Sequence, residues 1–294
     1  AFGRVLTRLL RDKALGKLVP QNQVTVFGFA CRHTASLMPL PIHLSHKLMR
    51  QLDQARADAR MPYLHPDGKV QVAIEISSGR PRSIHSIAIS PTGDRNGPGE
   101  KTVRSDLMDA VIGPAFTDEE LKPGKKTEIH IHPGGRLRGG GPAVHAGLTG
   151  RKTAIDTYGE YSRHSGSALS GKDPLRIDRV GAYAARWVAK NVVAAKLAEA
   201  CEIQVSYGIG RAQPISVLAR SFGSGALDDK ALTKRVAGVF DLRLGAILKD
   251  FELRRRVARA DDGFFEHLAA YGQLGREDLG VPWERLDRIE ALTD

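Results

Sequence analysis

The chain has 294 residues, 41% of them hydrophobic, so it can bury a substantial core as one large domain or as two to three small ones. No apolar run reaches the roughly 18 residues that a membrane-spanning helix needs, which excludes that class. Its 44 lysines and arginines against 33 acidic residues give a net charge of +11, and such an excess attracts nucleic acid, anionic lipid or phosphorylated ligands.

The first predicted element is a basic amphipathic helix over residues 1–18, where apolar residues recur at helical spacing and Asp12 is the one acid. It fits three interpretations: a docking helix, a helix packed on its own domain, or the remainder of an organelle-targeting segment. The third places the protein in the mitochondrial matrix or another organelle, and otherwise we expect it in the cytoplasm. The side chains expected to bind polyanions are Arg4, Arg8, Arg11, Lys13 and Lys17.

The remaining elements mix strands and helices, which indicates α+β domains that layer a sheet against helices. Alternating or continuous apolar runs predict the strands, and apolar residues at helical spacing predict the helices. Strands are predicted over residues 24–30, 70–76, 83–90, 127–132, 153–157, 202–209 and 215–221. Helices are predicted over residues 42–61, 105–112, 179–200, 230–240 and 244–253.

The two cysteines, Cys31 and Cys201, lie far apart in the sequence. Two cysteines in a chain of this length do not make a disulfide scaffold, and they fit a reducing compartment. We therefore predict two inert thiols in the core.

Two glycine-rich stretches, over residues 133–150 and 164–172, each deliver basic residues. Small residues let backbone N–H groups approach phosphate oxygens, while Arg and Lys neutralise the charge. A flexible linker is the alternative for the first stretch, but a predicted strand and a second such loop follow it at once. The pattern favours a phosphate site.

Specific motifs begin where these stretches end. They are GLTGRK at 147–152, DTYG at 156–159, SGKDP at 170–174 and DR at 178–179, followed by AYAAR at 182–186, VAKN at 188–191, CEIQVSY at 201–207, FDLR at 240–243, and AYG at 270–272 with GRE at 275–277. Upstream stand LMP at 37–39, PYL at 62–64 and PDGK at 66–69. In this order they closely resemble the S-adenosylmethionine synthetase (methionine adenosyltransferase) family, from about residue 27 to residue 283.

The resemblance implies an α+β fold of repeated sheet-plus-helix domains, with one repeat largely missing. We expect residues 1–18 to form the basic helix and residues 33–140 the first synthetase-like domain. Residues 141–179 would be the remnant of a second domain that carries the phosphate-site motifs, and residues 19–32 with 180–294 would form the third.

The resemblance also implies a reaction in which methionine sulfur attacks the ribose C5′ of ATP and the intact triphosphate leaves, to be hydrolysed afterwards. This chemistry needs alignment and stabilisation of a polyphosphate leaving group. The family uses Mg and K ions and builds each site between two subunits of a dimer. By motif, the triphosphate contacts would be Lys69, Arg151, Lys152, Lys172 and Arg176, the metal-side residue Asp178, and a substrate contact Asp67.

Several positions depart from the family pattern. The opening His-Pro-Asp-Lys motif is absent, so the match starts about a quarter of the way into a typical member. Asn22 and His145 stand where members carry substrate-side carboxylates, and Leu137 replaces the aromatic that stacks on adenine. Loss of a metal ligand and of an aligning carboxylate costs about several kcal/mol each in other enzymes. We expect little turnover.

The leading hypothesis is therefore not an enzyme but a degenerate homologue, a structural or binding subunit of a basic RNA-containing assembly such as a mitochondrial ribosome. In that role it needs no cofactor, whereas Mg, K and ATP are expected if the family site is functional. The alternative is an active methionine adenosyltransferase with a complementing subunit, and a third hypothesis is a regulatory subunit. The expected partners are RNA or a ribonucleoprotein, and a synthetase-fold subunit in a homo- or heterodimer.

Overall fold

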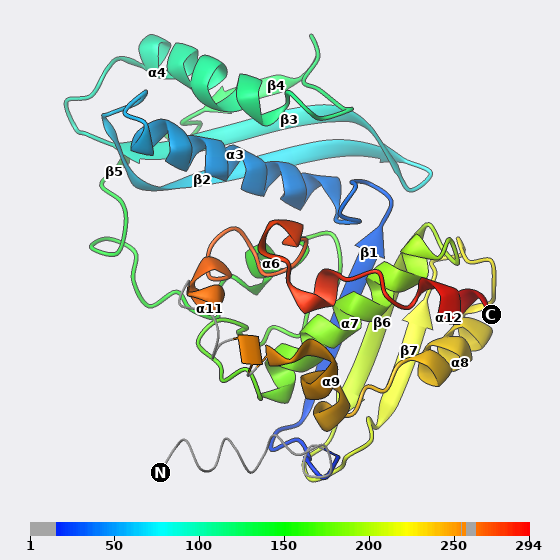
Figure 1. The fold of residues 1–294 in the computed structure, drawn as a ribbon. Coiled ribbons are helices and arrows are strands. Elements are labelled where there is room, and N and C mark those ends of the chain that lie inside the picture. Colours follow the sequence, from blue (N-terminus) through cyan, green and yellow to red (C-terminus); the bar gives the residue numbers. More distant parts are fainter. Residues whose placement is uncertain (1–15, 254, 257–262) are drawn as a thin grey trace, which may run out of the picture. The chain divides into compact units, whose positions relative to one another are not determined.

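A computed structural model describes residues 16–253, 255–256 and 263–294, which form two compact units (Figure 1). Residues 40–148 form the continuous unit. The split unit combines the described residues before 40 with those from 149 onward. Each unit layers one sheet against helices, so the predicted α+β class is confirmed. Most of the predicted basic helix lies outside the described residues, but Lys17 is exposed in a turn.

The units divide the chain differently from the expected domains. Residues 149–179, expected in a remnant of their own, belong to the same unit as 19–32 and 180–294. The reason is that this segment packs with α7 and β1 rather than forming a sheet. The predicted strand over 153–157 is instead the short helix α6 (Thr153–Asp156), closed by the Asp156 N–H on the carbonyl of Lys152 at 3.0 Å.

The continuous unit is built on a hairpin of two long antiparallel strands, β2 (Leu64–Ser77) and β3 (Arg80–Gly93). Ser78 and Gly79 join them with positive φ angles of 52° and 72°, as a tight hairpin turn requires. Two further strands, β4 (Glu128–Ile131) and β5 (Leu137–Arg138), pair with β3 in parallel. The helices are α3 (Leu40–Ala57), α4 (Glu100–Leu107), the π-helical turn η1 (Met108–Ile112) and α5 (Gly113–Ala115).

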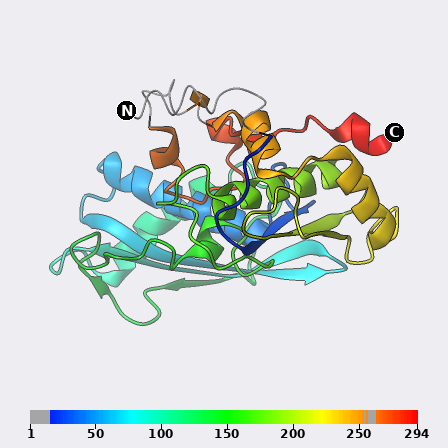
Figure 2. The same cartoon turned by 90° about the horizontal axis from the view of Figure 1, so that it is seen from below.

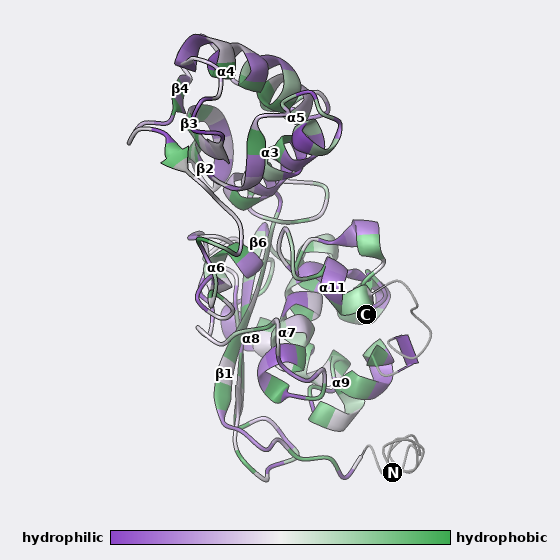
Figure 3. Ribbon diagram, turned by 90° about the vertical axis from the view of Figure 1, so that its left-hand side faces the viewer, coloured by the Kyte–Doolittle hydropathy of each residue, from purple (hydrophilic) through white to green (hydrophobic). Residues whose placement is uncertain are grey.

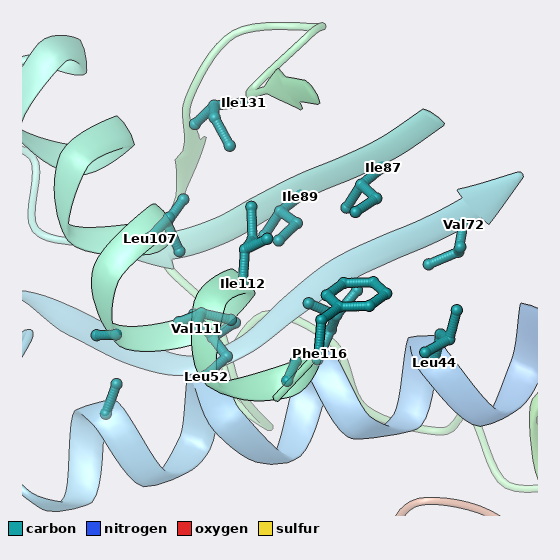
Figure 4. Packing of buried hydrophobic residues seen from close by; sticks show 14 of the residues in the cluster. Leu44, Leu52, Val72, Ile87, Ile89, Leu107, Val111, Ile112, Phe116 and Ile131 are labelled. Atoms are coloured by element: carbon teal, nitrogen blue, oxygen red, sulfur yellow. The ribbon is translucent and has the colours of Figure 1, made fainter. Parts of the chain in front are cut away.

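The core of the continuous unit lies between α3, the α4–η1–α5 run and the sheet (Figure 4). On α3, leucines recur every four residues, which places them on one face of the helix. This face packs toward strand residues such as Ile87 and Ile89, both fully buried. The leucines are Leu40, Leu44, Leu48 and Leu52.

The split unit has a three-stranded antiparallel sheet in the order β1 (Val24–Cys31), β6 (Ala200–Tyr207), β7 (Ser216–Arg220). Helices α7 (Ile177–Ala194) and α9 (Leu244–Phe251) lie on the same side of this sheet (Figures 1 and 2). Smaller elements complete the unit: α8 (Asp229–Val239), α11 (Phe264–His267), the 3-10 turns η2 (Glu277–Leu279) and η3 (Pro282–Glu284), and α12 (Ile289–Thr293).

Helix α7 presses directly onto β1. A Cβ atom at Gly28 would overlap the backbone of Ala185 and Arg186, so this close approach requires glycine. The helix is buried on nearly all sides although its ribbon carries both hydrophilic and hydrophobic colours (Figure 3). Cys31 and Cys201 lie buried as free thiols in the neighbouring strands, and burial raises the pKa of Cys31 to about 12.

Buried charges on α7 are compensated by the segment near the carboxyl end. Arg186 binds both carboxylate oxygens of Glu284, at 3.0 and 2.9 Å, and Lys190 binds the same carboxylate at 2.9 Å. Burial opposes ionisation of Glu284, but the two cations outweigh it and hold its pKa below the ordinary value. This network fixes residues 282–284 against the helix.

Candidate functional site

The first candidate site surrounds a buried carboxylate in the first turn of α7. Asp178 accepts hydrogen bonds from the Asn22 amide, whose Nδ2 lies 3.1 Å from each carboxylate oxygen, and it pairs with Lys172 Nζ at 3.0 Å. Ser167 Oγ lies 3.4 Å away. Burial disfavours the charge, yet the bonds from Asn22 and Lys172 outweigh it and keep the pKa of Asp178 low. We call Asn22, Ser167, Lys172 and Asp178 the Asp178 cluster.

Cations gather beside the Asp178 cluster. Arg176 is the exposed N-cap residue of α7, and Asn22, Lys172, Arg176 and Asp178 line one pocket with their neighbours. Helix N-termini and cationic side chains both attract anions. Arg151 and Lys152, also predicted for this site, do not line that pocket; they are exposed, and within the described part of the chain their side chains have no hydrogen bond or ion pair. The cluster and its surroundings are therefore suited to a phosphate group.

The second candidate site, in the continuous unit, is an irregular turn in β2 around Asp67. Asp67 has a positive φ of 114°, and its carboxylate accepts a bond from the N–H of Gly68 at 2.8 Å. His145 Nδ1 lies 2.8 Å from the other carboxylate oxygen. The buried Thr92 hydroxyl donates to the Asp67 carbonyl at 2.9 Å, and a Cβ at Gly140 would collide with that hydroxyl. The turn is thus held from both sides.

Two predicted site residues lie near this turn without joining it. Lys69 is exposed on β2, and within the described residues its side chain has no partner. Leu137 on β5 lines a separate pocket with Tyr63, Arg136 and other residues of the continuous unit. There the Tyr63 hydroxyl donates to Asp106 at 2.7 Å, and burial together with this carboxylate raises the pKa of Tyr63.

Sequence reasoning missed Thr92 and also Gln21, which lines the pocket beside the Asp178 cluster, and it gave Tyr63 only as part of the PYL motif. No local pattern separates Thr92 from other strand threonines, because its role depends on carbonyls some 25 residues upstream. Among the described residues, no three His, Cys, Asp or Glu side chains are grouped to hold a metal ion.

Comparison with known families gives two matches that cover nearly all of the chain. Residues 17–137 match the central domain of S-adenosylmethionine synthetase, and residues 139–285 match its C-terminal domain. The chain belongs to the S-adenosylmethionine synthetase family. This confirms the family and fold that the motifs indicated.

Similar synthetase-family proteins come from cyanobacteria. An S-adenosylmethionine synthase of Gloeobacter violaceus is 46% identical over 97% of this chain and 71% of its own length. Another from Synechocystis is 46% identical over 96% of the chain and 68% of its length. A third from Synechococcus is 47% identical over 93% of the chain and 68% of its length.

These relatives overturn the expectation of a non-catalytic subunit of an RNA-containing assembly, because each is named as a synthase. The chain spans about 70% of their length, so the absence of a His-Pro-Asp-Lys motif carries no conclusion about activity. Asn22 and His145, read as losses, instead bond the carboxylates of Asp178 and Asp67. Both carboxylates are therefore oriented by hydrogen bonds.

Every helix among the described residues is too short or too polar to cross a lipid bilayer. The mitochondrial location stays a prediction, and the relatives above are cyanobacterial. The expected roles of the site residues also stay predictions.

Proposed function

We propose that this chain is a methionine adenosyltransferase that makes S-adenosylmethionine from ATP and methionine. The observation that carries the proposal is 46% identity, over 97% of the chain, with an S-adenosylmethionine synthase. In this reaction methionine sulfur attacks C5′ of the ATP ribose and triphosphate leaves. The protein must align the two reactants and stabilise the charge that develops on the triphosphate.

The Asp178 cluster and its neighbours supply that stabilisation. Lys172 and Arg176 lie at the N-terminus of α7, where the helix dipole also favours an anion. Arg151 and Lys152, exposed on the GLTGRK loop, are free to reach phosphate oxygens. Together these side chains bind the triphosphate as it leaves.

Asp178 is the residue expected to bind a metal ion. Its lowered pKa keeps the carboxylate ionised at neutral pH, as a ligand must be. Mg²⁺ usually binds one or two carboxylates together with substrate phosphates and waters, so a single buried carboxylate beside a phosphate site fits it. Mg²⁺ would neutralise phosphate charge, and K⁺ is the second ion expected of the family.

In the continuous unit, the Asp67 turn contributes to substrate binding. Asp67 contacts substrate, Lys69 adds a cation, and Leu137 offers an apolar surface for the base. His145 is within hydrogen-bonding distance of one oxygen of Asp67 and thereby fixes its carboxylate. We further propose that the working protein is a homo- or heterodimer of synthetase-fold subunits.

The test is synthesis of S-adenosylmethionine from ATP, methionine, Mg²⁺ and K⁺, followed by mass spectrometry. We expect Lys172→Met to lower kcat/KM by about 10²–10³-fold, the scale of losing one charge-stabilising group. Lys125→Met, at an exposed loop lysine of the continuous unit, is the matched control and should leave the rate unchanged. If the wild-type protein, alone or with a synthetase-fold subunit, forms no product, the proposal fails.

A further inference from the structure

The turn that carries Lys172 is held at both ends by a buried chain of hydrogen bonds. Arg179 Nη1 donates to the carbonyl of Lys172 at 2.7 Å, and Arg179 Nε donates to the Tyr183 hydroxyl at 2.8 Å. That hydroxyl donates to Gln273 Oε1, and Gln273 Nε2 donates to Ser170 Oγ at 2.6 Å. We call Arg179, Tyr183, Gln273 and Ser170 the Arg179 relay.

The relay is rigid because three of its members, Arg179, Tyr183 and Gln273, are buried and packed. Tyr183 and Gln273 are fully buried, so each polar atom needs the partner it has. The Tyr183 ring stacks on Trp283 with centroids 3.7 Å apart, and the Trp283 indole donates to the Gln273 carbonyl at 2.9 Å. The Arg179 guanidinium lies over the Phe265 ring at 4.2 Å.

Gly171 lies between the two anchored residues with a φ of +79°, a conformation that other residues rarely adopt. Beyond it, Lys172 Nζ reaches Asp178 and the pocket beside it. The relay thus fixes the backbone from which the ammonium group of Lys172 extends.

We propose that Arg179, Tyr183 and Gln273 are positioning residues that set the place of the Lys172 ammonium group against the triphosphate. The inference rests on the proposed function, since it takes Lys172 as a triphosphate contact. The three residues act through Lys172 and do not touch the substrate. A charge held in place before the substrate binds needs no reorganisation when the leaving group develops its own charge.

The decisive variant is Tyr183→Phe, which keeps the ring that stacks on Trp283 and removes the hydroxyl that joins Arg179 to Gln273. We expect inorganic tripolyphosphate, measured by isothermal titration calorimetry, to bind about tenfold more weakly, the scale of one hydrogen bond to a charged group. In the assay, KM for ATP should rise and kcat fall, with KM for methionine unchanged. Gln273→Met, similar in size, should act in the same way.

A double-mutant cycle separates positioning from general damage. In a Lys172→Met background, Tyr183→Phe should weaken tripolyphosphate binding by less than twofold, because its route of action has gone. The control is Tyr207→Phe, which removes another buried hydroxyl of the split unit, bonded to the Leu242 carbonyl at 2.9 Å. It should lower the melting temperature and leave tripolyphosphate affinity unchanged.

Two results would overturn the inference: full tripolyphosphate affinity in Tyr183→Phe, or an equal loss with and without Lys172. Absence of turnover in the wild-type protein, with the coupling intact in the binding cycle, would instead sink the proposed function and leave the relay standing.

Discussion

Helices α3 and α7 have 18 residues each but differ in which side chains they bury. The buried residues of α3 are all apolar, and all but Ile42 lie on one face, which covers the sheet of the continuous unit. Helix α7 is buried from Ile177 to Val193, charged residues included. Helix α3 supports a core, whereas α7 gathers loops from distant parts of the chain around its charges.

The energetic consequences differ as well. Burial of the α3 leucines stabilises the unit by about 1.5–3 kcal/mol per side chain, without any specific partner. A buried ion pair contributes little net stability, but removing one partner leaves a charge in the interior. The α7 network should therefore be the more sensitive to a single substitution.

The largest expected effect is on Arg186, whose loss leaves the buried Glu284 with Lys190 as its remaining cation. Arg186→Leu should lower the free energy of unfolding by roughly 3–5 kcal/mol, measured by urea denaturation. Arg243→Leu removes an exposed pair with Asp241 and should cost about 1 kcal/mol or less. Equal stability of Arg186→Leu and the wild type would erase the contrast between the two helices.

The matched substitution on α3 is Leu48→Ala, at a fully buried position. It removes methyl groups and leaves a cavity, so the free energy of unfolding should fall by about 2–5 kcal/mol. The loss should lie in the lower half of that range if the neighbouring strands move into the cavity. Leu48→Met, which conserves volume, should cost less than about 1.5 kcal/mol. A leucine substitution that costs more than Arg186→Leu would reverse the ranking.

The smallest effect concerns a carboxyl beside α7 that has no such compensation. Burial raises the pKa of Asp156 from 3.8 to about 6, with Arg179 opposing the shift. Because the folded pKa lies above the unfolded one, the wild type loses stability as pH rises from about 4 to 6. Asp156→Asn removes this loss. We expect its melting temperature to exceed that of the wild type by about 2–4 °C at pH 8 and to match it near pH 4.

The pKa of Asp229 is shifted in the opposite direction, so the same substitution there should have the opposite effect on the melting temperature. Hydrogen bonds from the side chain and backbone N–H of Ser221 lower its pKa, so its ionised form stabilises the fold at pH 8. Asp229→Asn should therefore lower the melting temperature at pH 8 and have little effect at low pH. A stabilising Asp229→Asn, or a destabilising Asp156→Asn at pH 8, would contradict the assignment.

Much of the fold could be predicted from periodicity. The strand predicted over 24–30 is β1, and the helix predicted over 42–61 is α3, which begins at Leu40 and ends at Ala57. The segment 153–157 was misleading because five residues of alternating character are too few to distinguish a strand from a turn of helix. Periodicity could not pair β1 with β6 across most of the chain, and the expectation that residues 19–32 join 180–294 came from the family resemblance instead.

The candidate site was predictable only in part. The motifs brought Lys172 and Asp178 together, and the structure places them 3.0 Å apart. Asn22 was singled out as a departure from the family pattern, but its bond to Asp178 could not be predicted, because it joins residues 156 positions apart. Gln273 and Thr92 carry no local signal, since each acts through partners that only the tertiary fold assembles.

The pairing of β1 with β6 also means that β1 leaves the ribosome long before its partner strand is made. Thr25 and Ser206, whose hydroxyls meet at 2.9 Å in this pairing, are 181 residues apart. At roughly 5–20 residues per second, translation leaves β1 without its neighbour for about 10–35 seconds. During that interval the nascent strand presents unpaired backbone and buried-type side chains such as Val26 and Phe29, so early binding of a chaperone to this segment would favour correct assembly.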